Sequence, residues 1–401
     1  LGTPTNNKKW TFSAWVKKGH IGGNINTLFS AGGDNANYFQ IWTNYNNGYI
    51  QYYSQSGGST AGSMRLENRL RDISGWYHIV VSYDSANSTA SERLKIYING
   101  NQELDTSGGG DLTYPTQNAS SLINSAIEHT IGKDSYRNDS YLDGSVSHLH
   151  FIDGTIYGAS AFGETDATTG EWKAKTSPSV TYGNNGFFIL KDGNGITDQS
   201  SNSNNFTLGG GTLTDLKDNP DNVFNTFNPL DNFQEAGTFY NGNATYQTGT
   251  ANGKYSRNTS TLGMTSGKFY WEVKPILVNA SNDYYPYVGI TASQITGTQD
   301  FVGKAATDYA WGTNYNGSDT KKWNNNSGTA WGNHFALNSI VGVAVDLDNN
   351  KIYFSKDGVW QESGDPTSGS TGTGAAFTIT SASSTPLGAY FPSLSKKGLN
   401  E

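Results

Sequence analysis

The chain of 401 residues contains no cysteine. Disulfide bonds and cysteine-ligated metal sites are therefore excluded. Because animal extracellular modules often carry disulfides, this absence favours synthesis in a reducing cytoplasm, wherever the protein later works. The first residue is Leu1 and not methionine, so we expect the sequence to be processed or trimmed.

Charged residues are also scarce, and basic residues are the minority among them. They make up 15% of the chain, and 26 Lys and Arg against 34 Asp and Glu give a formal net charge of −8. Binding to phosphate backbones needs clustered Lys and Arg, so nucleic acid is not an expected partner. No apolar run reaches the roughly 18 residues of a membrane-spanning helix, and no signal-peptide pattern opens the chain. We therefore expect no membrane insertion.

Long segments with helical periodicity are missing as well. The chain is instead rich in aromatic residues, at 13%, and in glycine, with 49 residues. Tyr and Trp suit pleated, half-buried surfaces and Gly suits turns, so this composition favours many short strands. A chain of this length is too long for one ordinary core, which predicts two domains.

The stretch 340–360 shows the strand pattern most clearly. Val341, Val343 and Val345 alternate with small or polar residues, which is the two-residue period of a strand with one buried face. An Asx-rich turn, a second strand and an Asp-Gly dipeptide typical of a tight hairpin follow. A similar unit spans residues 76–100. Repeated strands that run into Asx-Gly turns predict an antiparallel β protein with two related halves.

Three segments of the first part of the chain carry a family resemblance. WTFSAWVKK, WYHIVVSYD…LKIYING and YLDGSVSHLHFIDGT occur in the order of the laminin-G-like domain, a concanavalin-A-type jelly roll, which they resemble over residues 1–160. Residues 161–236 are polar and irregular, and we expect a connector with a few short strands there. A connector of this kind after a laminin-G-like domain resembles structural proteins of tailed bacteriophages of marine bacteria.

The last part of the chain resembles a second family. SGKFYWEVKP, PYVGIT, VGVAVDLDNNKIYFSKDGVW and GAYFPSLS follow the order of the SPRY domain, another jelly-roll sandwich, which is expected over residues 237–401. That family usually has a closing strand after its F-P segment, whereas KKGLNE follows here, so the closing strand is expected to be cut off or supplied by another chain. The predicted fold class is all-β, with two concanavalin-A-like jelly-roll β sandwiches joined by a polar connector.

Candidate catalytic and metal-binding groups are few. Jelly rolls also host glycosidases, which need two facing carboxylates, but the E-x-D-x-x-E pattern of retaining glucanases with this fold does not occur. His148 and His150 lie two apart, and without a third ligand they are expected to be polar-face residues and not a zinc site. Asp134, Asp139 and Asp143 mark a polar loop that calcium could occupy, with a solvated loop as the alternative. No cofactor is predicted.

Aromatic residues interleaved with Asn and Gly give a stronger signal, for binding. Aromatic rings stack on the apolar faces of sugars, amides bond to hydroxyls, and loops on a rigid sandwich often carry recognition. The alternative is that roughly half of these rings fill the cores, and alternation favours that for Tyr52 and Tyr287. The candidate ligand-binding residues are Trp42, Tyr45, Tyr49, Tyr284, Tyr285, Trp311, Tyr315, Trp323 and Trp331.

The stretch 311–331 is the expected recognition surface of the second domain. It holds three tryptophans and is so interrupted by Gly and Asn that we expect a loop and not a regular strand. Exposing large aromatic side chains costs hydration free energy, so a loop that keeps several of them is expected to use them on a partner.

The resemblance implies a non-enzymatic bacteriophage virion protein, either a tail fibre, a spike or a capsid-surface appendage. Such a protein is made in the host cytoplasm, lies on the virion surface and binds a glycan or protein receptor of the host cell. Two alternatives stay open: a polysaccharide depolymerase of the virion, and an adaptor that binds other virion proteins through its SPRY-like domain. Appendage proteins are usually symmetric, so we expect a homo-oligomer, with a trimer as the first expectation.

Overall fold

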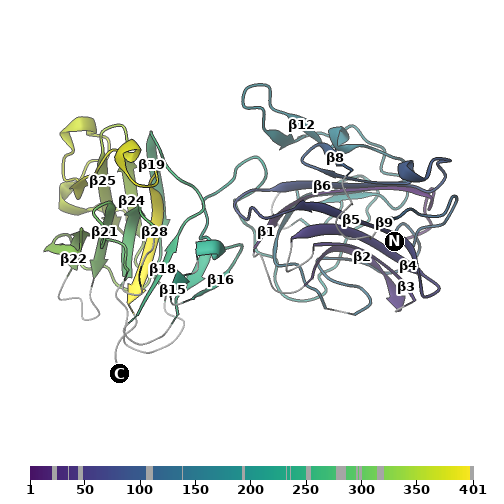
Figure 1. Ribbon diagram of the computed structural model, residues 1–401, viewed down its shortest axis with the longest axis horizontal. Helices are drawn as coiled ribbons and strands as arrows, with labels where there is room; N and C mark the ends of the chain where they lie inside the picture. The colour runs from purple at the N-terminus through teal and green to yellow at the C-terminus, as the bar shows by residue number, and fades with distance from the viewer. Residues whose placement is uncertain are drawn as a thin grey trace. The chain divides into compact units, whose positions relative to one another are not determined.

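The computed structural model shows two compact units, Leu1–Phe224 and Asn225–Glu401, coloured purple to teal and teal to yellow in Figure 1. The structure describes residues 1–19, 25–34, 36–43, 48–104, 112–137, 139–191, 195–231, 233–234, 236–249, 254–276, 286–294, 297, 300–313 and 320–397. Each unit contains two larger antiparallel sheets, with its apolar residues packed into a core.

The first unit has two six-stranded sheets and one small hairpin (Figure 1). The first sheet has the order β14 (Phe187–Ile189), β11 (Gly144–Asp153), β1 (Lys9–Lys18), β6 (Tyr77–Asp84), β7 (Leu94–Ile98), β8 (Asn101–Glu103). The second has the order β10 (His129–Ile131), β2 (Asn26–Asp34), β3 (Asn37–Thr43), β4 (Tyr49–Ser56), β5 (Ser59–Arg69), β9 (Leu112–Thr113). The hairpin pairs β12 (Gly163–Thr165) with β13 (Trp172–Ala174).

Alternation along β1 builds the core of the first unit. Trp10 and Phe12 are completely buried and face the second sheet, where Phe39 and Tyr52 are also buried. The Trp10 ring stacks on that of Tyr83 at a centroid distance of 5.2 Å and meets the Phe39 ring edge-on at 5.7 Å. Offset and edge-on aromatic pairs of this kind add to the free energy gained from burial alone. The core position expected for Tyr52 is confirmed.

The second unit has a seven-stranded sheet and a five-stranded sheet. The seven-stranded sheet has the order β15 (Phe233–Gln234), β18 (Tyr255–Thr259), β28 (Phe391–Lys397), β20 (Pro286–Thr291), β21 (Asp308–Thr313), β22 (Thr320–Asn324), β23 (Ser327–Ala330). The five-stranded sheet has the order β19 (Lys268–Val273), β24 (Val341–Asp346), β25 (Lys351–Lys356), β26 (Val359–Trp360), with β27 (Phe377–Thr378) also on β25. β16 (Thr238–Tyr240) and β17 (Thr245–Gln247) form a separate hairpin.

The predicted hairpins of stretch 340–360 are present. Val341, Val343 and Val345 of β24 are buried in the core between the sheets. β25 pairs with β24 on one side and β26 on the other, and the turn into β26 has positive φ angles at Asp357 and Gly358, as a type I′ turn requires.

Helical structure is confined, among the described residues, to six 3-10 turns of three residues each: η1 (Ala90–Glu92), η2 (Ala159–Ala161), η3 (Pro229–Asp231), η4 (Gln361–Ser363), η5 (Gly369–Thr371) and η6 (Ala382–Ser384). The predicted all-β fold class with two sandwich units is therefore confirmed. In the same part of the chain, no helix has the length and apolarity that crossing a membrane demands.

The segment 161–236 does not form a separate connector in this structure. Its strand β14 extends the first sheet beside β11, and Phe187 is buried in the core. The Lys17 ammonium, which is buried, lies 2.5 Å from the Asp218 carboxylate. The sequence does not reveal this role, because few residues of the segment are apolar. The boundaries expected at residues 160 and 236 therefore differ from the division after Phe224.

The strand of the F-P segment, β28, is paired on both sides. It lies between β18 and β20, with Arg257 opposite Ser395 and Tyr287 opposite the same residue on the other side. Neither edge of β28 is therefore left open by the closing strand that was expected to be missing. The homo-oligomer stays a prediction, without support from an unpaired edge at β28.

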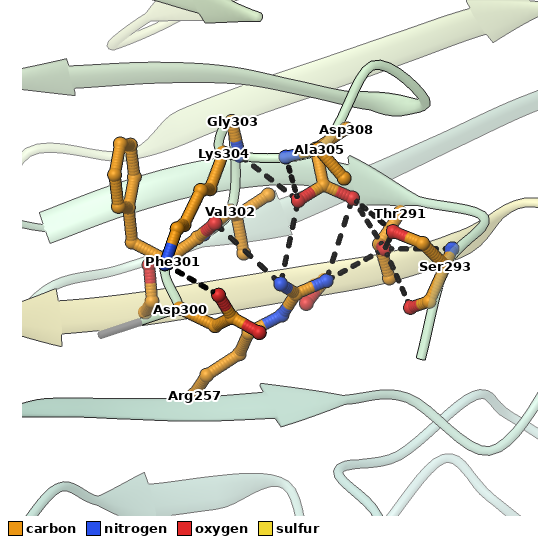
Figure 2. Close-up of polar contacts among 12 residues, drawn as sticks. Arg257, Thr291, Ser293, Asp300, Phe301, Val302, Gly303, Lys304, Ala305 and Asp308 are labelled. Carbon is orange, nitrogen blue, oxygen red and sulfur yellow. Dashed lines mark hydrogen bonds and ion pairs between the residues drawn. The ribbon is translucent and has the colours of Figure 1, made fainter. Parts of the chain in front are cut away.

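A buried arginine–aspartate pair connects three strands of the seven-stranded sheet (Figure 2). Arg257 on β18 and Asp308 on β21 are both almost completely buried, with 3.3 Å between Nη1 and Oδ2. Arg257 Nη2 donates to Thr291 Oγ1 at 2.6 Å, and that hydroxyl donates to Asp308 Oδ1 at 2.6 Å. The pair therefore fixes β18, β20 and β21 relative to one another.

The same carboxylate organises the loop that precedes β21. Asp308 Oδ2 accepts the backbone N–H groups of Gly303 at 3.4 Å and Ala305 at 3.2 Å, and Oδ1 accepts the Ser293 hydroxyl at 3.0 Å (Figure 2). Burying a charge is unfavourable unless it is paired and hydrogen-bonded, and here Asp308 is both. Removing one partner would leave the other charge buried without compensation.

We expect Asp308→Ala to lower the free energy of unfolding of the second unit by about 3–5 kcal/mol, because it strands Arg257 in the interior. Lys304→Ala is the matched control, since Lys304 pairs at 2.8 Å with Asp300 while remaining partly exposed. Its loss should cost less than about 1 kcal/mol. Urea unfolding of the full chain, followed through the tryptophan fluorescence of both units, measures the two values. Equal losses for both variants would contradict this role of the pair.

Candidate functional site

The outward face of the second sheet in the first unit carries an uninterrupted polar row. The register of the ladder places its members opposite one another across all six strands, in the order Thr130, Ser30, Gln40, Tyr53, Ser63, Thr113. Each of these side chains has a hydroxyl or an amide, and none is charged. The row follows from alternation, because the neighbours Phe39 and Tyr52 on the same strands face the core.

One half of this row is covered by the loop 133–137. Gln40 Nε2 donates to the buried carboxylate of Asp134, and Ser30 Oγ donates to the Lys133 carbonyl at 2.9 Å. Asp134 Oδ1 in turn accepts the backbone N–H of Tyr136 at 2.8 Å. These bonds anchor the loop to the sheet and so determine where Tyr136 lies.

Three tyrosine rings pack together beside this loop. The Tyr38 ring lies 5.6 Å from that of Tyr53 and 6.0 Å from that of Tyr136, and all three are partly exposed. The Arg137 guanidinium lies 5.9 Å from the Tyr38 ring centroid. Burial, followed by the neighbouring Tyr53, raises the pKa of Tyr38 above its usual value of 10, so its hydroxyl stays protonated at neutral pH.

A second group extends this surface along β4 and β5. Gln51 Nε2 donates to Ser63 Oγ at 3.0 Å, and Arg65, which is paired with Gln51 in the ladder, places its guanidinium 5.0 Å from the Tyr49 ring centroid. The resulting surface, the tyrosine face, comprises Tyr38, Gln40, Tyr49, Gln51, Tyr53, Arg65, Tyr136 and Arg137.

The chemistry of the tyrosine face suits a ligand with both apolar and hydroxylated surfaces. Rings that are packed against each other keep a fixed position and offer their faces to C–H groups. The phenol hydroxyls and the two guanidinium groups supply donors and acceptors around them. The amides of Gln40 and Gln51 are buried and bonded within the protein. A pyranose sugar has this combination of C–H faces and hydroxyls.

The structure places one predicted binding residue of the first unit on this face. Tyr49 belongs to it. Trp42 lies opposite Gln51 in the ladder, while its side chain is outside what the structure describes. The remaining predicted residues that fall outside the described part of the chain are Tyr45, Tyr284, Tyr285 and Tyr315.

The stretch 311–331 is not the irregular loop that its composition indicated. Its described parts belong to the strands β21, β22 and β23, which pair in sequence at the end of the seven-stranded sheet. Trp311 is 0% exposed and packs on Phe335 at a ring distance of 4.6 Å. Its assignment to a ligand-binding surface was therefore wrong, because alternation along β21 turns this ring into the core.

Trp323 and Trp331 are half-buried and make packing contacts. The Trp323 ring meets Tyr287 and Phe301 edge-on at 5.8 and 5.4 Å, in a small cluster on the outward side of the sheet. Tyr287 is buried, as expected, but in this outward cluster and not in the core between the two sheets. Trp331 meets the Trp311 ring edge-on at 5.9 Å. Ligand binding by Trp323 and Trp331 stays a prediction.

The candidate calcium ligands bond to different groups. Asp134 serves the loop described above, Asp139 Oδ1 accepts the Ser140 hydroxyl at 2.7 Å, and the charge of Asp143 acts on the ammonium of Lys18. Among the described residues, no three His, Asp or Glu side chains come together in an arrangement able to hold a metal ion.

The histidines of β11 are buried beneath the segment that follows that strand. His150 Nδ1 hydrogen-bonds to the Tyr182 hydroxyl at 2.9 Å, and its ring stacks on Phe188 at 3.9 Å. Nearby His78 Nδ1 accepts the Trp172 indole N–H at 2.9 Å. These imidazoles act as packed hydrogen-bonding groups, and His148 and His150, which were expected as polar-face residues, are both buried.

Most of the tyrosine face was missed from the sequence. The alternation of β3 and β4 contained the signal for Tyr38 and Tyr53, because each is flanked by a core residue. Tyr136 and Arg137 left no local signal, since only the fold brings loop 133–137 onto β3.

Two β-sandwich units, one with an aromatic outward face, define an all-β protein. Residues 2–160 match the family model of the concanavalin A-like lectin/glucanases superfamily. Residues 268–393 match the model of the SPRY domain. The chain thus combines a region similar to that superfamily with a region similar to SPRY domains, as its motifs indicated. Among curated proteins, none matches the chain.

Three solved structures illustrate the likeness. The SPRY domain of human HERC1 is 16% identical, over 43% of this chain and 91% of that chain, with a TM-score of 0.31. A heptameric SAP-like pentraxin from Limulus polyphemus is 17% identical, over 39% and 69%, with a TM-score of 0.27. CBM40 of the Ruminococcus gnavus IT-sialidase is 13% identical, over 38% and 80%, with a TM-score of 0.30. Likenesses this distant carry no information about function.

The buried imidazoles make the first unit sensitive to acid. Burial, with a smaller effect of His148, lowers the pKa of His78 to about 3 and pushes that of His150 well below the usual 6.5. Burial also lowers the pKa of His129 to about 4. Between about pH 6.5 and 4, these histidines are therefore neutral in the folded unit and protonated in the unfolded chain.

We expect the first unit to lose stability as the pH falls from about 6.5 towards 3. Each such histidine lowers the free energy of unfolding by about 1.4 kcal/mol per pH unit between its unfolded and its folded pKa, because only the unfolded chain is protonated there. Above pH 6.5 the contribution is complete. Thermal unfolding between pH 7.5 and 4.5 measures the slope. His78→Gln removes one titrating group and should flatten it, and an unchanged slope would contradict the assignment.

Proposed function

We propose that the protein binds glycans non-enzymatically through the tyrosine face, as a structural component of a bacteriophage virion. The observation that carries the glycan part is the contact of Tyr38 with Tyr53 and Tyr136 on a face that also carries two guanidinium groups. Packed rings lose little entropy on binding, and the surrounding donors and acceptors match sugar hydroxyls.

The match of residues 2–160 supports this choice of ligand in a general way. The name of the matched superfamily covers lectins and glucanases alike, so the side chains must separate binding from hydrolysis. Hydrolysis needs two carboxylates that face each other across the scissile bond. The polar row contains none, and Asp134, which lies beside it, is buried and bonded to Gln40 and to backbone N–H groups. This favours binding over depolymerisation.

The virion role rests on the resemblance of the connector and its preceding domain to phage structural proteins. A tail fibre, spike or capsid appendage on the virion surface would bring the tyrosine face to the polysaccharides of a bacterial host. The SPRY-like unit would then be free to hold other virion proteins. Electron microscopy of whole particles labelled with an antibody to this chain tests the location.

Replacement of Tyr53 or Tyr136 by Ala should weaken glycan binding about five- to tenfold each, because each ring contributes about 1–1.5 kcal/mol of contact. A glycan array of neutral and acidic hexoses identifies a ligand, and titration with the selected oligosaccharide gives the affinities. Tyr240→Ala is the matched control, since Tyr240 is an exposed tyrosine in the β16–β17 hairpin of the second unit. All three variants should keep the melting temperature of the original protein.

Two results would contradict the proposal. Equal affinity of the Tyr53→Ala and Tyr240→Ala variants would move the binding site elsewhere. Release of reducing sugar from a bound polysaccharide, measured over hours against controls without the protein, would establish that the protein is a depolymerase instead.

A further inference from the structure

β19 stands at one end of the five-stranded sheet and is paired on one side (Figure 1). Among the described strands, none is paired with its other edge. Phe269 lies opposite the core residue Val345, yet it is 39% exposed, and its neighbour Tyr270 is 54% exposed. An aromatic-rich open edge is a template for pairing with another chain, so folded proteins normally cover it.

The sequence of this edge is complementary to itself. Lys268, Tyr270 and Glu272 are alternate residues of β19, so their side chains share the outward face. If two copies pair antiparallel about Tyr270, then Lys268 lies opposite the partner's Glu272 and Tyr270 opposite the partner's Tyr270. Opposite charges and aromatic pairs directly across a ladder are stabilising.

Neighbouring registers lack this match. Centring the pair on Trp271 places Lys268 opposite the partner's Lys274, which is repulsive. Centring it on Phe269 places Glu272 opposite the partner's Ser266 and leaves both charges without an opposite charge. The register about Tyr270 is the one of these three that pairs both lysines with both glutamates.

The side chains concerned are already held in place. The Tyr270 hydroxyl donates to Glu272 Oε1 at 2.6 Å, and it lies so close over Gly342 that a Cβ there would come within 2.8 Å of it. Lys268 lies 3.3 Å from Asp346 on β24, and its side chain is 56% exposed. The outward face of the edge is thus ordered before any partner arrives, which limits the entropy lost on association.

We propose that two copies of the protein associate by antiparallel pairing of their β19 strands about a twofold axis at Tyr270. The two five-stranded sheets then form one continuous sheet, and the interface is isologous, with the same residues contributed by each copy. The open edge with its exposed Phe269 becomes covered. This contact concerns the second unit and does not depend on glycan binding by the first.

Cysteine cross-linking tests the register directly, because the chain has no cysteine of its own. Directly opposed residues of an antiparallel pair have Cα atoms about 4.5–5.5 Å apart, a separation that a disulfide spans. Under mild oxidation Tyr270→Cys should form a covalent dimer. Val359→Cys is the control, since Val359 is 67% exposed in the same sheet but far along it from β19. Equal cross-linking of both variants, or none at Tyr270→Cys, would overturn the register.

Charge reversal tests the complementarity. Lys268→Glu and Glu272→Lys should each raise the dimer dissociation constant at least about tenfold, since symmetry turns two attractive pairs into two repulsive ones. The double variant Lys268→Glu/Glu272→Lys restores both pairs and should return to within about threefold of the original. Sedimentation velocity over a concentration series measures all four proteins, and circular dichroism verifies that each is folded. A trimer, a monomer at every concentration, or a double variant no better than the singles would overturn the proposal.

Discussion

A strand turns successive side chains to opposite sides of its sheet, and both units depend on this constraint. Along β3 and β4 it places Phe39 and Tyr52 in the core while Tyr38 and Tyr53 face outward. In β21 the same rule buries Trp311. The same residue type therefore lies in the core at one position of a strand and on the outward face at the next. The strand residues of the tyrosine face are those that alternation directs away from the core.

Polar groups in the interior add specificity to this pattern. Alternation alone does not fix how far the strands are shifted along one another, because apolar side chains tolerate many relative positions. The Arg257–Asp308 pair adds a specific contact between such strands. His78, with its bond to Trp172, performs a similar task in the first unit. Both arrangements lower the number of alternative packings. Burying their polar groups costs desolvation free energy, which their hydrogen bonds offset.

The sequence predicted what local pattern controls. Strand periodicity and Asx-Gly turns were sufficient for the all-β class and for the β24–β25 hairpin, and ordered motifs indicated both families. Contacts between distant segments left no such trace. Tyr136 reaches Tyr38 from a loop about a hundred residues along the chain. Arg257 and Asp308 are 51 positions apart in the sequence. Composition also misled at residues 161–236, where the triplet Phe187–Ile189 adds a strand to the first sheet from within a polar segment.

The contribution of β14 has a practical consequence for anyone who divides this chain. A fragment ended at residue 160, where the family match stops, would lack the strand that borders β11 and the core side chain of Phe187. Lys17 would remain buried without the carboxylate of Asp218. The compact unit extends to Phe224, so the family match ends more than sixty residues before the unit does.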